Sequence, residues 1–200
     1  MKLPKLVIFD LSDVLIKGLE GCEYPLAKEL KLPVEQVAQE LFSYDFHSFY
    51  IGQVNESDCL RDIIKKYNWN IDIPRFKKLI RNNFKEILGT REIIREVSKK
   101  FLTILLSVNP VEWATYFRKY FDLEGLFNKG IYFSYQIGFT KRQKESFLYI
   151  LQKHNLNPDD ALLIDDSKRN LGIAADVGIH GIRFTSPEQL KNELIANKIL

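Results

Sequence analysis

The 200-residue chain has little of several features that mark particular protein classes. Its two cysteines, Cys22 and Cys59, have neither a CxxC nor a Cys/His spacing, which excludes a disulfide framework and a zinc signature. Lys and Arg number 29 against 26 Asp and Glu, and the net charge of +3 comes from scattered residues rather than a basic block. The sequence therefore predicts a cytoplasmic protein with reduced thiols and no nucleic-acid partner.

Long apolar runs are also missing. The apolar stretch from Leu6 to Phe9 is followed by Asp10 and Asp13, which excludes the core of a signal peptide. No window approaches the roughly 18 apolar residues that a membrane span requires. Hydrophobic residues nevertheless make up 46% of the chain and aromatic residues 12%, enough to fill a sizeable core. We expect a soluble protein without a membrane contact, and the sequence does not indicate its oligomeric state.

Short apolar runs alternate with helical patterns along most of the chain. The runs predict buried strands at residues 5–9, 102–106, 161–164 and 181–184, with a weaker candidate at 131–133. Thr90 is expected to cap one of the intervening helices, and Pro110 to open another. This alternation predicts an α/β fold in which a doubly wound parallel sheet is covered by helices on both faces.

Residues 17–88 break the alternation because they show helical periodicity and no convincing strand. Helices are expected to begin near Pro33, Asn55 and Pro74. We interpret residues 17–88 as a helical subdomain inserted into an α/β core that comprises residues 1–16 and 89–200.

Polar residues follow the predicted strands, and the carboxyl ends of parallel strands form the usual ligand-binding edge of such a sheet. They are Asp10, Ser107, Asn109 and the pair Asp165 and Asp166. Lys141 lies in a loop before a helix and could reach the same edge. Carboxylates gathered there repel one another unless a cation neutralises them, and oxygen ligands favour Mg²⁺. Such a site would suit a phosphate ester.

In their order along the chain, these residues resemble the motifs of the haloacid dehalogenase superfamily of phosphatases. The first motif is similar to residues 7–15, VIFDLSDVL, and the second to residues 105–107, LLS. Lys141 matches the third motif, and residues 162–167, LLIDDS, match the fourth. The inserted helices resemble the helical cap of this family's first cap type. The resemblance implies a Rossmann-like core with a cap that closes the site and selects the substrate.

The resemblance also implies a role for each matched residue. Asp10 would attack phosphorus and form an aspartyl-phosphate, and Lys141 and Ser107 would hold the phosphate oxygens together with the backbone near Val108 and Asn109. The expected Mg²⁺ ligands are Asp10, the backbone carbonyl of Ser12, Asp165 and Asp166. The implied activity is hydrolysis of a small phosphorylated metabolite, a sugar phosphate or similar.

Two departures from the family pattern keep other functions open. Ser12 stands where the fullest form of the first motif has an Asp that serves as general acid and base, and Val108 stands where an Asn is usual. A hydroxyl does not titrate near neutral pH, so either activity is reduced or another group, such as Asp13, supplies the proton. A second hypothesis is an impaired relative that binds a phosphorylated ligand or a partner protein. Cleavage of a carbon–halogen bond without Mg²⁺ is a third.

Structural explanations exist for the same residues. Asp10 could end a strand, and Asp165 and Asp166 could cap a helix. Lys141 lies in a basic stretch that could simply face solvent. A group of aromatic residues in the insertion fits helix packing better than a substrate-binding wall, although one or two could face the site: Tyr44, Phe46, Phe49 and Tyr50.

Overall fold

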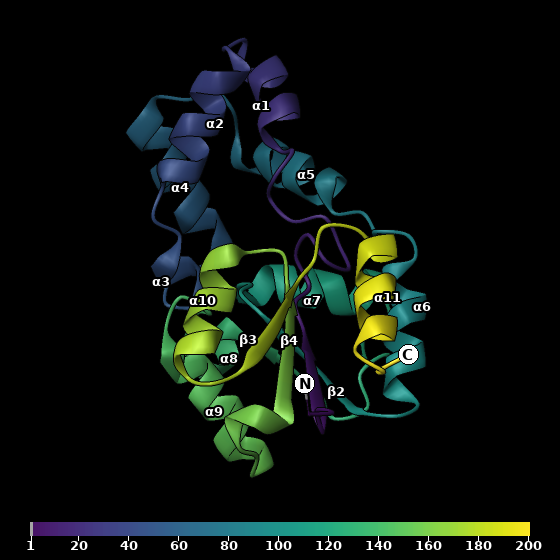
Figure 1. Ribbon diagram of the computed structural model, residues 1–200. Helices are drawn as coiled ribbons and strands as arrows, with labels where there is room; N and C mark the ends of the chain where they lie inside the picture. Colours follow the sequence, from purple (N-terminus) through teal and green to yellow (C-terminus); the bar gives the residue numbers. More distant parts are fainter. Residues whose placement is uncertain (1) are drawn as a thin grey trace.

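The computed structural model describes residues 2–200 and contains one five-stranded parallel sheet (Figure 1). The strands are β1 (Leu6–Phe9), β2 (Leu102–Ser107), β3 (Gly130–Phe133), β4 (Ala161–Asp165) and β5 (His180–Arg183). Their order across the sheet is β3-β2-β1-β4-β5, and every neighbouring pair is parallel. Each predicted strand is present to within one residue at either end, and the predicted α/β fold class is confirmed.

Helices cover both faces of this sheet. On one face, α6 (Thr90–Ser98), α7 (Val111–Tyr120) and α11 (Pro187–Ala196) pack against a core that includes Val7 and Phe9. On the other, α9 (Lys144–His154) and α10 (Lys168–Asp176) pack against Leu6 and Ile8. A short helix, α8 (Ser134–Ile137), follows β3, and a 3₁₀ turn (Pro158–Asp160) precedes β4. Because both faces are covered, β1 is apolar at every position rather than at every second one.

The segment between β1 and β2 begins with five helices, drawn in purple to blue-teal above the sheet in Figure 1. They are α1 (Glu23–Leu30), α2 (Val34–Ser43), α3 (His47–Tyr50), α4 (Glu56–Tyr67) and α5 (Ile73–Asn83). Asn55 caps α4 as predicted, accepting a hydrogen bond from the Asp58 backbone N–H at 3.0 Å. The sequence pattern did not indicate α1 or α3. Among residues 2–200, no helix is both long enough and apolar enough to traverse a bilayer.

The chain enters and leaves this helical insertion at one place. Ile16 pairs antiparallel with Glu86, and the Lys17 N–H donates to the Lys85 carbonyl at 2.8 Å. Thr90 begins α6, but its hydroxyl does not cap the helix as expected, because it donates to the Val14 carbonyl at 2.9 Å. This crossing lies beside the predicted boundaries at residues 16 and 89, and the division into two domains remains a prediction.

A buried carboxylate at the start of α4 ties the insertion to α7. Glu56 is 2% exposed, and it accepts a hydrogen bond from Trp113 Nε1 at 2.7 Å. Arg81 of α5 pairs with the same carboxylate at 2.7 Å, and Lys77 lies 3.4 Å from it. The Glu56 backbone N–H donates to the Glu112 carboxylate at 2.9 Å. This network fixes α4 and α5 against the sheet-covering helix α7.

Candidate active site

The carboxyl ends of β1, β2 and β4 place the predicted functional residues at one edge of the sheet. Asp10 directly follows β1, while Ser107 and Asp165 are the last residues of β2 and β4. Phe9 is in register with Leu105 on one side and Ile164 on the other, so Asp10 lies beside Leu106 and Asp165, and Ser107 is one residue further along β2. The Asp10 N–H continues this pairing by donating to the Ile164 carbonyl at 2.9 Å.

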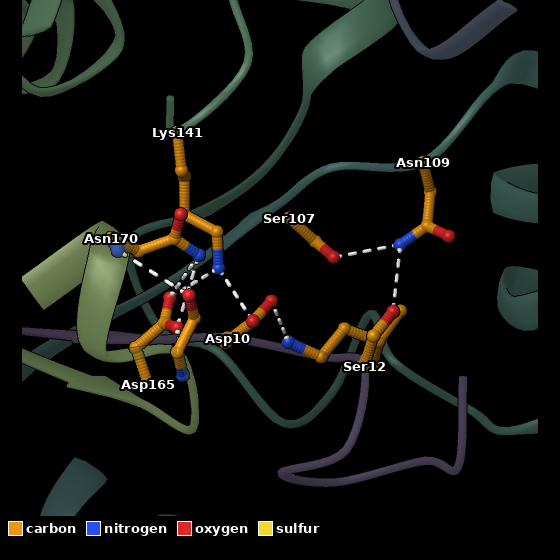
Figure 2. A network of polar contacts seen from close by, with 9 residues as sticks. Asp10, Ser12, Ser107, Asn109, Lys141, Asp165 and Asn170 are labelled. Carbon is orange, nitrogen blue, oxygen red and sulfur yellow. Dashed lines mark hydrogen bonds and ion pairs between the residues drawn. The ribbon is translucent and has the colours of Figure 1, made fainter. Parts of the chain in front are cut away.

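Lys141 lies at the centre of this edge (Figure 2). Its Nζ is 2.6 Å from Asp10 Oδ2 and 2.5 Å from Asp165 Oδ2. The lysine side chain is 2% exposed and Asp165 is fully buried, which rules out a solvent-facing role for this lysine. An ammonium group shared between two buried carboxylates satisfies the requirement that buried charges be paired.

Asp165 uses both carboxylate oxygens within the protein. Oδ1 accepts hydrogen bonds from the Ser167 backbone N–H at 2.9 Å and from Asn170 Nδ2 at 3.1 Å. Oδ2 is held by Lys141, and Asn170 Nδ2 lies 3.3 Å from it. Asp165 is therefore a fixed support for Lys141. Asn170 was absent from the predicted site, and its position in the first turn of α10 is the signal that could have found it.

Three carboxylates around one ammonium leave an excess of negative charge. Oxygens of Asp10, Asp165 and Asp166 lie within 4.8 Å of one another, and with Lys141 their formal charge is −3 + 1 = −2. Burial raises the pKa of Asp10 to about 8; Lys141 opposes this shift, and Asp165 and Asp166 add to it. Burial, followed by repulsion from Asp165, raises the pKa of Asp166 to about 6. Burial alone would lower the pKa of Lys141, but Asp10 and Asp165 outweigh it and the net pKa is raised.

This donor set fits a hard divalent cation. Its charge would neutralise the excess and favour the ionised carboxylates, and carboxylate oxygens are the ligands that Mg²⁺ prefers. Ligands at about 2.0–2.1 Å from one ion are separated by at most about 4.2 Å. The oxygens of the three carboxylates all lie within 4.8 Å of one another, which is close to that limit.

A second polar group flanks Asp10 on the side of β2. Asn109 Nδ2 donates to Ser107 Oγ at 2.7 Å and lies 3.4 Å from Ser12 Oγ (Figure 2). Since the Ser107 oxygen accepts from Asn109, its own proton stays available for another acceptor. Ser107 and Asn109 are each 1% exposed, so this donor is held in a fixed position.

A cavity of about 340 Å³ lies between this edge and the helical insertion. From the core it is lined by Ser12, Val108, Asn109, Thr140, Arg142, Ser167 and Asn170, among others. The insertion contributes side chains from the region of α2 and α3, described below. Asp10 is 5% exposed and is not part of this lining, whereas its neighbours Ser12 and Asn170 are.

The eight predicted site residues converge in this structure. Six of them appear with Asn170 in Figure 2, Asp166 belongs to the carboxylate cluster, and Val108 lines the cavity. Asp13 lines the cavity but is not part of the carboxylate cluster: it has a left-handed backbone with φ 58°, and its carboxylate accepts a hydrogen bond from the Gly18 N–H at 3.1 Å. The roles assigned to these residues remain predictions.

Comparison with known proteins yields several relatives. Phosphorylated carbohydrates phosphatase from Thermotoga maritima is 26% identical over 185 residues, covering 88% of this chain and 82% of that protein. Flavin mononucleotide hydrolase 1 from Arabidopsis thaliana is 21% identical over 198 residues, covering 96% of this chain and 77% of that protein.

A solved haloacid dehalogenase family enzyme from Bacteroides thetaiotaomicron, crystallised with magnesium, superposes with a TM-score of 0.80 at 19% identity. The superposition covers 97% of this chain and 99% of that one, and at this identity it establishes the fold. A family model described as haloacid dehalogenase-like hydrolase matches residues 4–178. Because that match runs from β1 through the helical insertion to the end of α10, this chain belongs to the haloacid dehalogenase-like hydrolase family.

Proposed function

We propose that this protein is a Mg²⁺-dependent phosphomonoesterase that acts on a small phosphorylated metabolite through an aspartyl-phosphate on Asp10. The observation that carries the proposal is the buried Lys141, which lies between Asp10 and Asp165 within a cluster of three carboxylates. The relatives named as a phosphorylated carbohydrates phosphatase and a flavin mononucleotide hydrolase support a phosphorylated substrate.

Asp10, the backbone carbonyl of Ser12 and Asp166 would hold the Mg²⁺. Of the acidic pair, Asp166 is assigned to the ion because both oxygens of Asp165 already accept hydrogen bonds from protein donors. The ion supplies charge neutralisation between the carboxylates and the anionic substrate. The retained acidic pair also favours this chemistry over metal-free cleavage of a carbon–halogen bond.

The side chains divide the reaction into two displacements. A carboxylate oxygen of Asp10 forms a bond to phosphorus while the bond from phosphorus to the ester oxygen breaks, and the alcohol leaves. Lys141 and the Ser107 hydroxyl hold the non-bridging oxygens as charge develops on them. Water then attacks phosphorus, which breaks the acyl-phosphate bond and restores Asp10. Because Ser12 does not titrate near neutral pH, the protons are exchanged with water in the cavity.

Phosphate release from a panel of sugar phosphates, nucleotides and an aryl phosphate tests this proposal. We expect release that requires Mg²⁺, stops on addition of a chelator and returns when Mg²⁺ is restored in excess. Activity that persists in the chelator would contradict the assigned role of the carboxylate cluster. The best substrate in the panel would identify the substrate class.

Restoring a carboxyl group at position 12 is expected to raise activity. Ser12 lines the cavity beside Asn109, so the Ser12→Asp side chain would lie where the leaving group departs. Proton transfer by a positioned side chain contributes about 10²–10⁴-fold, and we expect at least a tenfold gain in kcat for substrates with poor leaving groups. The Ser12→Asn variant is the control, because it has a similar shape and cannot titrate.

The same variant separates the two main hypotheses. Measurable turnover by the wild-type protein, raised further in Ser12→Asp, supports a working enzyme. A wild-type protein without turnover that becomes active only in Ser12→Asp would instead favour an impaired relative whose role is binding. An equal gain in Ser12→Asn would show that shape rather than proton transfer is responsible.

A further inference from the structure

The part of the cavity beyond the phosphate site has an aromatic wall. Phe42 of α2, Tyr44 and Phe46 of the following link, and Tyr50 of α3 line it together with Trp113 of α7. Four of these rings form a continuous series: Tyr44 and Phe46 have centroids 4.9 Å apart, Phe46 and Tyr50 5.5 Å, and Tyr50 and Trp113 6.2 Å. The wall belongs mainly to the insertion and faces the edge that carries Asp10.

Core packing does not account for the whole wall. Trp113 is 3% exposed and is held by Glu56 and by edge-to-face contact with Phe49 at 5.4 Å, so its position follows from packing. Phe42 is 48% exposed, and Tyr44, Phe46 and Tyr50 are each half-buried. Ring surface left open inside a concave site, next to a few placed polar groups, is what a ligand with its own flat apolar surface covers.

The charges of the lining restrict that ligand further. Asp13, Glu20 and Asp45 line the cavity against Arg142, which gives a formal charge of −3 + 1 = −2 without counting His47. The substrate phosphate itself would be held by Lys141 together with the proposed Mg²⁺ at the carboxylate cluster, whose residues are not part of this lining. A second anionic group on the leaving group would lie among these three carboxylates and be repelled.

We propose that this cavity selects phosphate monoesters whose leaving group carries a planar ring and no negative charge. The inference rests on the proposed phosphomonoesterase function and names the substrate class for the same site. A volume of about 340 Å³ is at the low end of the roughly 300–1,000 Å³ usual for ligand pockets, which suits a leaving group of one or two fused rings.

Two matched pairs of substrates test the proposal. Benzyl phosphate and cyclohexylmethyl phosphate are both esters of primary alcohols and differ in the flatness and π-system of the ring. We expect kcat/KM to be about fivefold higher for benzyl phosphate, within the range that aromatic contacts contribute. The second pair is 4-(aminomethyl)benzyl phosphate and 4-carboxybenzyl phosphate, and here we expect the carboxylate to lower kcat/KM by about fivefold.

Substitutions of aromatic residues in the wall should reduce the preference for benzyl phosphate over cyclohexylmethyl phosphate. Phe46→Leu keeps an apolar side chain and removes the ring, so the ratio of kcat/KM for benzyl phosphate to kcat/KM for cyclohexylmethyl phosphate should fall below about twofold. Phe42→Leu, at a more exposed position, is a second variant in which folding is not at risk. Asp45→Asn removes one of the three carboxylates, so it should reduce the difference in kcat/KM between 4-(aminomethyl)benzyl phosphate and 4-carboxybenzyl phosphate.

Several outcomes would overturn the proposal. Equal kcat/KM for benzyl and cyclohexylmethyl phosphate in the wild-type protein would do so, and so would an equal loss for both in the two leucine variants. If none of the four esters is hydrolysed and the panel of sugar phosphates, nucleotides and an aryl phosphate also releases no phosphate, the phosphomonoesterase proposal fails. Calorimetric binding of benzylphosphonate and cyclohexylmethylphosphonate, which cannot be hydrolysed, then decides separately whether the cavity prefers the planar ring.

Discussion

The Asp10→Asn variant is expected to lose phosphate release by on the order of 10³-fold or more. An amide cannot form the aspartyl-phosphate, and it cannot supply the anionic oxygen that the carboxylate cluster offers to a divalent cation. The measurement is Mg²⁺-dependent phosphate release on the best substrate of the panel. Asp176→Asn, an exposed residue at the end of α10, is the matched control and should keep wild-type kcat.

The fold of the Asp10→Asn variant should survive. Burial raises the pKa of Asp10, which means that its ionised form is disfavoured in the folded protein, and Lys141 keeps Asp165 as a partner at 2.5 Å. We therefore expect a melting temperature no lower than that of the wild-type protein. An inactive variant with a clearly lower melting temperature would leave loss of structure as the explanation. Wild-type activity in a folded variant would exclude Asp10 as the nucleophile.

The Glu56→Ala variant is expected to lower the free energy of unfolding by about 3–5 kcal/mol. Without this carboxylate, Arg81 loses the partner it holds at 2.7 Å, and the buried indole N–H of Trp113 loses its acceptor. In a protein of this size the change corresponds to a drop in melting temperature of about 6–20 °C. Calorimetry and urea denaturation both measure it.

Controls separate this network from a general effect of removing a carboxylate. Glu96→Ala, at an exposed position of α6, should change the free energy of unfolding by no more than about 0.5 kcal/mol. Glu56→Gln retains an acceptor for Trp113 but not the charge. Its decrease in the free energy of unfolding should therefore lie between the decreases in Glu56→Ala and Glu96→Ala. A Glu56→Ala protein as stable as the wild type would mean that the network does not hold the insertion to α7.

The sequence was sufficient to predict the strands and the edge of the sheet at which the candidate site residues meet. Strands such as β1 are continuous apolar runs because both faces are buried, and an acidic or hydroxyl residue follows each run that ends at the site. Parallel pairing then brings Asp10, Ser107 and Asp165 together whatever the order of the outer strands. These are local patterns combined with one rule of sheet geometry.

Contacts between distant segments could not be predicted in the same way. No sequence pattern indicates that Lys141 lies between Asp10 and Asp165, which are 131 and 24 residues away, rather than in solvent with the rest of its basic stretch. Thr90 is another example, because a hydroxyl at a helix start can cap the helix or bond to a distant carbonyl, and here it bonds to Val14. Some aromatic residues of the insertion are buried in the core and others line the cavity, depending on how they pack against α7. Helical periodicity in the sequence does not predict which residues do which.

The crossing of the chain at Ile16 and Glu86 has a consequence for engineering. Because the two connections of the helical insertion are neighbours, joined by hydrogen bonds of 2.8 Å from Lys17 to Lys85 and from Ile87 to Leu15, replacing everything between them would close the core with a short link. Closing a short gap between adjacent ends has a small entropic cost. We therefore expect that a graft at these two points, if it also supplies an acceptor for the Trp113 indole in place of Glu56, would place a different set of walls beside the edge that carries Asp10.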